Sequence, residues 1–141
     1  MKKSFVLVFA FCISGLLAMA GTDKKATLTV TVKNLKSKEG KVSVSLFKDE
    51  KSFLNDGESR HTVITQEGEA SVTFDGIHPG VYAVSVIHDE NGNGKLDTAV
   101  FGIPVEPYGF SNNARGTFGP ASFDDSKFVV EGDKRIEINV E

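Results

Sequence analysis

Residues 89–97 combine the side-chain types and the spacing of a cation-binding loop. Their sequence, DENGNGKLD, places oxygen-bearing side chains at the first, third, fifth and ninth positions and a glycine at the sixth. In calcium loops alternate residues converge on one ion, the seventh contributes a carbonyl oxygen, and the glycine permits a sharp bend. The predicted ligands are the side chains of Asp89, Asn91, Asn93 and Asp97 and the backbone carbonyl of Lys95.

The loop differs in two respects from the calcium loops that lie between helices. Its twelfth position, where a glutamate normally completes the shell, is Val100, and residues 81–87 before it have the pattern of a strand. Glu106 is the nearest downstream carboxylate to complete the shell, and Asp124 or Asp125 is the alternative. Because few charges reach the ion, we expect weak calcium binding, with a dissociation constant of about 10⁻⁴ to 10⁻³ M. A metal-free turn is the competing interpretation, since Asn-Gly pairs favour tight turns with positive φ.

The residues available for catalysis predict a protein that is not an enzyme. Beyond Cys12 the chain has no cysteine, and it has neither a Gly-x-Ser-x-Gly elbow nor a phosphate-binding glycine loop. His61, His78 and His88 lack a ligand-type spacing, so each is predicted to be an ordinary surface or strand-end residue rather than a zinc ligand. His88 adjoins the acidic loop, where it can orient Asp89 or donate to a strand-end carbonyl.

Residues 101–123 follow the acidic loop and show no regular alternation. Long irregular segments inside a domain are usually functional or disordered, and the Phe and Tyr side chains here favour an ordered loop held down by its aromatics. The segment has two interpretations: a stacking surface for a sugar or peptide, or a cap over the open end of the fold. Arg115 is expected to pair with Glu106 or with the acidic pair 124–125. The candidate ligand- or partner-binding residues are Tyr108, Phe110, Asn112, Arg115 and Phe118.

Period-two alternation of apolar and polar residues dominates the rest of the chain and indicates half-buried strands. Residues 48–57 lack it and favour a helical turn. The predicted strands are residues 27–33, 42–47, 61–66, 70–74, 81–88, 127–130 and 135–140. About seven short strands without a long helical pattern predict an all-β fold, a single antiparallel β-sandwich of the immunoglobulin-like or prealbumin-like kind. The long irregular loop follows the acidic loop in this arrangement.

The first 20 residues have the pattern of a cleaved export signal. Two lysines precede an apolar run too short to span a membrane, and Ala18-Met19-Ala20 is a small-x-small cleavage site with the mature start near Gly21. The expected mature domain is residues 21–141, periplasmic or secreted, without cysteine and without membrane insertion after cleavage. Removing Lys2 and Lys3 leaves 14 basic and 19 acidic residues, a net charge of −5. That charge argues against nucleic acid as a partner, since its phosphates require basic patches.

Several motifs together resemble one bacterial family of exported proteins. They are HDENGNGKLD at 88–97, FGIP at 101–104, YGFSN at 108–112 and FGP at 118–120. The family is domain-of-unknown-function 2141, and the resemblance extends over nearly the whole mature chain. It implies a secreted or periplasmic β-sandwich and no assigned activity. FDGIHPGVY at 74–82 also resembles a strand-turn-strand signature of prealbumin-like and carboxypeptidase-regulatory-like modules.

These observations predict a non-enzymatic exported protein in which bound calcium stiffens the aromatic segment for binding a protein or glycan of the cell envelope. One alternative is a carbohydrate-binding or carbohydrate-processing accessory protein that uses the aromatic face. Another is a subunit of a larger envelope complex. Three observations separate these hypotheses. Loss of calcium-dependent stabilisation on substitution of the loop ligands tests the first, and loss of glycan binding on substitution of the aromatic residues tests the second. Capture of the protein with partners from native membranes tests the third.

Overall fold

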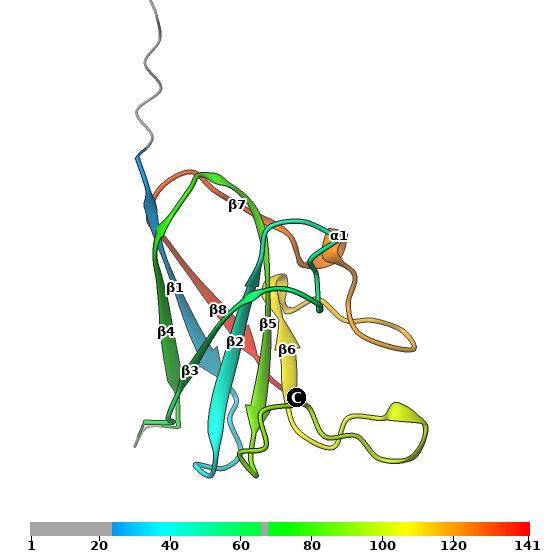
Figure 1. The fold of residues 1–141 in the computed structure, drawn as a ribbon. Coiled ribbons are helices and arrows are strands. Elements are labelled where there is room, and N and C mark those ends of the chain that lie inside the picture. Colours follow the sequence, from blue (N-terminus) through cyan, green and yellow to red (C-terminus); the bar gives the residue numbers. More distant parts are fainter. Residues whose placement is uncertain (1–23, 66–67) are drawn as a thin grey trace, which may run out of the picture.

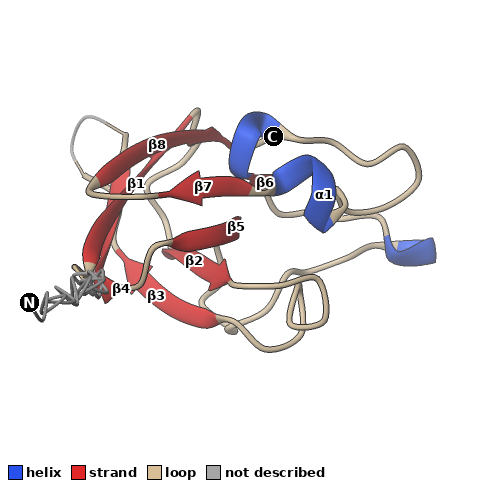
Figure 2. Cartoon of the chain, turned by 90° about the horizontal axis from the view of Figure 1, so that it is seen from above, coloured by secondary structure: helices blue, strands red, loops and turns tan. Residues whose placement is uncertain are grey.

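Two β-sheets face each other and enclose the core of this protein (Figures 1 and 2). The computed structural model describes residues 24–65 and 68–141, so the expected signal peptide at 1–20 lies outside the described residues. The strands are β1 (Ala26–Lys33), β2 (Lys41–Phe47), β3 (Glu58–Thr62), β4 (Ala70–Ile77), β5 (Gly80–Asp89), β6 (Tyr108–Phe110), β7 (Phe128–Val130) and β8 (Lys134–Asn139). The short helices are η1 (Val100–Gly102), η2 (Ser111–Asn113) and α1 (Phe123–Ser126).

Alternation along the strands places the core between the sheets. In β1 every second residue is fully buried, from Leu28 through Val30 to Val32, and the threonines between them face outward. Val42 and Val44 of β2 close the core from the other sheet. Burial of these branched aliphatic side chains is the main source of stability of such a sandwich. The all-β sandwich predicted from the sequence is therefore confirmed.

The strand order gives one sheet of β4-β1-β8 and a second of β3-β2-β5-β6, with β7 also paired to β5. Most pairings are antiparallel, but β1 and β8 run parallel. The predicted antiparallel arrangement holds for the other strand pairs but not for this one. The chain leaves the second sheet after β7 and crosses to the first, and a parallel pair requires such a crossover.

Residues 48–57, predicted to form a helical turn, form hydrogen-bonded turns without a regular helix, and the Asp56 N–H donates to the Ser52 carbonyl at 2.9 Å with the spacing of one helical turn. Asp49 accepts a 2.8 Å hydrogen bond from the backbone N–H of Ser52, which holds the pKa of the Asp49 carboxyl below its ordinary value. The turn ends at Gly57, where a Cβ atom would lie 2.5 Å from the ring of Phe47. None of the helices in residues 24–65 and 68–141 has the length and apolar character needed to span a bilayer.

Candidate functional site

The acidic loop begins where β5 ends and winds around the carboxylate of Asp89. This side chain is 5% exposed. Its Oδ1 accepts a 3.1 Å hydrogen bond from the backbone N–H of Asn93, and its Oδ2 accepts a 2.8 Å bond from that of Gly94. Both Gly92 and Gly94 have positive φ, the conformation that the sequence predicted for this turn. Asp89 therefore determines the path of the loop.

The remaining polar side chains of the loop converge on Asp97. Asn93 donates from Nδ2 to Asp97 Oδ1 at 2.7 Å, and Asn91 donates from Nδ2 to Asp97 Oδ2. The amide oxygens of Asn91 and Asn93 accept from the backbone N–H groups of Asn93 and Lys95, each at 3.0 Å. Three of the predicted side-chain ligands, Asn91, Asn93 and Asp97, are thus brought together, whereas Asp89 bonds to backbone N–H groups.

Glu106 closes the base of this loop. It is 6% exposed, although it lies in an irregular part of the chain. Its Oε1 accepts from the backbone N–H of Glu90 and its Oε2 from that of Asp97, both at 2.9 Å. One buried carboxylate therefore joins the beginning and the end of the acidic loop. Sequence reasoning selected Glu106 for its proximity, and the structure places it beside the loop.

The other carboxylates considered for this site lie elsewhere. Asp124 forms an ion pair with Lys127 at 2.6 Å, and Asp125 accepts from Ser122 within the first turn of α1. The interpretation in which either residue folds back to the acidic loop was wrong, because capping and charge pairing hold both at the short helix.

The donor set of the loop suits a hard cation. Asp89, Asp97 and Glu106 supply carboxylate oxygens, and Asn91 and Asn93 supply amide oxygens, the ligand types that calcium prefers. In the part of the chain that the structure describes, no group of three or more His, Cys, Asp and Glu side chains is placed to hold a metal. A site here would therefore depend on the asparagine oxygens as well as on the carboxylates.

His88 lies directly beneath the loop, in the core. It is fully buried, and its Nε2 lies 2.8 Å from the carbonyl oxygen of Glu39. Its Nδ1 has no hydrogen-bond partner among the described residues and lies 3.9 Å from Glu90 Oε1. The prediction of an ordinary surface or strand-end residue holds for its place at the end of β5 but not for the surface, because His88 continues the inward-facing alternation of Val84 and Val86. The carbonyl that it contacts belongs to the turn before β2 rather than to a strand end.

Phe110 and Tyr108 lie on the outer face of the second sheet, because they pair with Ser85 and Ile87, whereas Val84 and Val86 face the core. The Phe110 ring is buried, with its centroid 6.1 Å from that of Phe53 and 5.9 Å from that of Tyr108. Phe53 also makes edge contacts with Phe47 at 5.2 Å and with Phe123 at 5.7 Å. The rings therefore form a small aromatic cluster against this face rather than a cap over the open end of the sandwich. Phe110 does not belong to an exposed stacking surface.

The other candidate residues of the segment have separate surroundings. Asn112 donates from Nδ2 to the carbonyl oxygens of Asp125 and Lys127, at 3.0 and 2.9 Å. Arg115 forms an ion pair with Glu141 at 2.8 Å, so the expected pairing with Glu106 or with residues 124–125 was wrong. The reason is topological. Glu141 and Tyr108 exchange two backbone hydrogen bonds, which bring the C-terminal residue close to where the Arg115 loop begins. Phe118 is fully exposed.

The acidic loop continues directly into a small hairpin of residues 98–105 that the sequence reasoning missed. Thr98 and Pro104 form an antiparallel bridge, and Ala99 donates its N–H to the Ile103 carbonyl at 2.7 Å. At the tip Phe101 adopts φ 63° and is 97% exposed. The sequence did contain a signal for this hairpin. The eight residues between Asp97 and Glu106 are all apolar or small and carry no charge.

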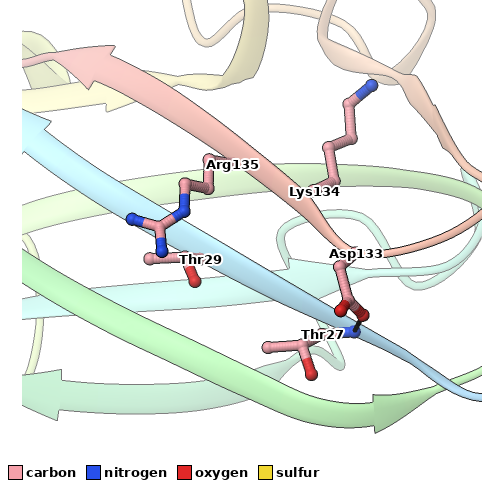
Figure 3. Close-up of a pocket in the computed structure, with 5 residues that line it drawn as sticks. All are labelled: Thr27, Thr29, Asp133, Lys134 and Arg135. Carbon is pink, nitrogen blue, oxygen red and sulfur yellow. Dashed lines mark hydrogen bonds between the residues drawn. The ribbon is translucent and has the colours of Figure 1, made fainter.

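A shallow hollow of about 480 Å³ lies at the beginning of β1 and β8 (Figure 3). Thr27 donates its backbone N–H to Asp133 Oδ1 at 2.9 Å across its floor, and Thr29, Lys134 and Arg135 complete the lining. It lies at the opposite end of the sandwich from the acidic loop, and none of the candidate residues lines it.

Comparison with known proteins gives a family but no activity. A family model described as "Uncharacterized protein conserved in bacteria (DUF2141)" matches residues 30–139. No curated protein and no solved structure matches this chain. The match spans most of the sandwich, the acidic loop, the hairpin and the aromatic segment.

Proposed function

Because this chain belongs to the bacterial DUF2141 family, whose description gives no activity, we propose a function from its own geometry. It is a non-enzymatic exported protein that binds calcium weakly through residues 89–97 and Glu106. The ion stiffens the segment that follows, and this segment binds a partner or ligand in the cell envelope.

The observation that supports the proposal best is the double hydrogen bond of Glu106. Its carboxylate accepts hydrogen bonds from the backbone N–H groups of Glu90 and Asp97. It therefore connects the acidic loop to the segment that leads into β6. A carboxylate oxygen has more than one lone pair and can accept an N–H and a cation together. An ion on the loop therefore acts on the base of the hairpin at 98–105.

The charges of the loop give calcium a way to stabilise the fold. Asp89, Asp97 and Glu106 all bond within this loop or at its base, so three carboxylates contribute negative charge to it. Asn91 and Asn93 direct N–H groups at Asp97, which partly offsets its negative charge. Calcium replaces those donors: the two amide groups rotate, and their oxygens bind the ion.

The proposal is tested by titration calorimetry on metal-stripped protein spanning residues 21–141, together with thermal melts in calcium, magnesium or chelator. We expect saturable calcium binding with a dissociation constant of about 10⁻⁴ to 10⁻³ M and a higher melting temperature. Asp97→Asn removes one ligand charge while keeping the size of the side chain, so it weakens binding.

Asp56→Asn is the matched control, because it removes the same charge from an exposed turn at the opposite end of β2. It leaves calcium affinity unchanged. Absence of binding heat and of stabilisation would reduce residues 89–97 to a metal-free turn. Equal effects of the two substitutions would show that calcium responds to net charge rather than to this loop.

A further inference from the structure

Two loops project from the same side of the sandwich. In Figure 1 the yellow-green segment that contains η1 and the orange segment between η2 and α1 both extend to the right, and Figure 2 shows the same from above. The first is the hairpin of residues 98–105 and the second is the loop of residues 114–120. Both are convex features that extend beyond the packed sheets.

The exposed side chains of these loops are strongly apolar. Phe101 is 97% exposed, Val100 73% and Ile103 61%, and Phe118 on the second loop is fully exposed. We call these four residues the apolar tips. Large apolar side chains rarely gather in full contact with water unless they bind something.

Charge is nearly absent from the same loops. Residues 98–105 contain no Asp, Glu, Lys or Arg, although the chain as a whole has a net charge of −3. In residues 114–120 the single charged side chain is Arg115, which is neutralised by Glu141 at 2.8 Å. Insertion of the tips into an apolar medium would therefore bury no unpaired charge.

Two hollows on the described surface of this chain do not fit the tips of a second copy. One is lined by Thr27, Thr29 and residues 133–135 and the other by residues 129 and 131–134, which are mainly polar and charged. Neither provides an apolar socket for a Phe ring. The apolar tips project from the molecule and carry no charge. They instead suit a fluid apolar layer, whose molecules can rearrange around them.

We infer that the apolar tips dock this protein on the surface of a neutral lipid membrane, with the rings of Phe101 and Phe118 in the interfacial layer. The inference rests on the binding role proposed above for the segment after the acidic loop, but it does not require calcium. Attraction comes from burial of apolar area, and the net negative charge opposes binding to anionic lipid.

The test is partition of the protein into phosphatidylcholine vesicles, measured by sedimentation in chelator and in calcium. Because the chain lacks tryptophan, Phe101→Trp supplies a single reporter. We expect its emission to shift to the blue on vesicles and to be quenched by brominated lipid chains. Addition of phosphatidylglycerol should weaken partition at low salt, and added salt should restore it.

The double variant Phe101→Ser with Phe118→Ser should lower the partition coefficient on the order of 100-fold, since two aromatic side chains no longer insert. The matched control is Val63→Ser with Val129→Ser, which removes two exposed apolar side chains outside the tips and should change partition less than about twofold. Equal losses in the two variants, or no partition of the native chain, would overturn the inference.

Two further outcomes separate the possible explanations. A concentration-dependent dimer that the tip variant abolishes would assign the tips to a second copy, which also overturns the lipid assignment. Partition that is equal in chelator and in calcium, with no calcium binding by calorimetry, would refute the calcium site and leave membrane docking in place.

Discussion

Glu106 shows how a single buried charge can organise a loop. Both of its oxygens accept backbone N–H groups, one at each end of the acidic loop, so the carboxylate is satisfied without a counter-ion. Hydrogen bonds to a charged acceptor contribute more than neutral ones, and a buried donor left without its acceptor is costly. The shape of the candidate site therefore depends on a residue nine positions beyond its last conventional ligand.

Glu106→Gln tests this role. The amide keeps one acceptor oxygen and places an NH₂ group against the other N–H, so we expect the free energy of unfolding to fall by about 1–3 kcal/mol. Urea denaturation measures it. Glu131→Gln is the control, because it removes the same charge from an exposed turn and should stay within about 0.5 kcal/mol of the native chain. Equal losses would show that Glu106 contributes only its charge.

At the scale of elements, two short strands, β6 and β7, pair with different parts of strand β5. Its residues 85–87 pair with β6 and residues 80–82 pair with β7, which leaves Ala83 and Val84 between the two short strands. The hydroxyl of Ser111 fills this gap: it accepts from the Val84 N–H at 2.8 Å and donates to the Ser126 carbonyl at 2.5 Å. A side chain thus replaces a missing strand residue and joins η2 to the end of α1.

Ser111→Ala should therefore lower the free energy of unfolding by about 1–3 kcal/mol, because the buried Val84 N–H loses its acceptor. Chemical denaturation measures the loss, and amide exchange at Val84 should accelerate. Ser71→Ala on the exposed face of β4 is the matched control and should change stability by less than about 0.5 kcal/mol. An unaltered exchange rate at Val84 would mean that another acceptor replaces the hydroxyl.

The elements that the sequence predicted are those that depend on local pattern. Strand β1 was predicted because alternation is a property of consecutive residues, and the acidic loop because its spacing is local. Strand β6 was missed because three residues are too few to show a period, and its partners come from β5. The burial of His88 could not be predicted from local pattern, because it depends on which face of β5 meets the other sheet.

The exposed tips were missed for a different reason. Sequence reasoning assigned all aromatics of residues 101–123 to buried or stacked positions, because burial is the usual fate of Phe. The structure buries Phe110 but leaves Phe101 and Phe118 in solvent. Nothing in the local pattern distinguishes these rings, since the difference depends on which of them the pairing of β6 brings against Phe53.

At the scale of the whole molecule, stability is expected to be unevenly distributed. The sandwich core holds fully buried side chains from both sheets, whereas residues 98–105 and 114–120 project from it with few packed contacts. Segments with few buried apolar contacts open at low free-energy cost, and proteases cleave them first. The same loops carry exposed Phe side chains, which are preferred sites for chymotrypsin.

Native-state digestion with chymotrypsin should therefore cut first after Phe101 and Phe118, as followed by mass spectrometry over time. The pieces should stay associated on a sizing column, because β8 pairs with β1 and β7 pairs with β5 across either cut, and β6 also pairs with β5 across the cut after Phe101. Calcium should slow the cut after Phe101 more than that after Phe118, because only the first loop is anchored on residues 89–97. The fully buried Phe74 is the internal control: early cleavage there would show that the sandwich opens as readily as its loops, and would contradict the uneven distribution of stability.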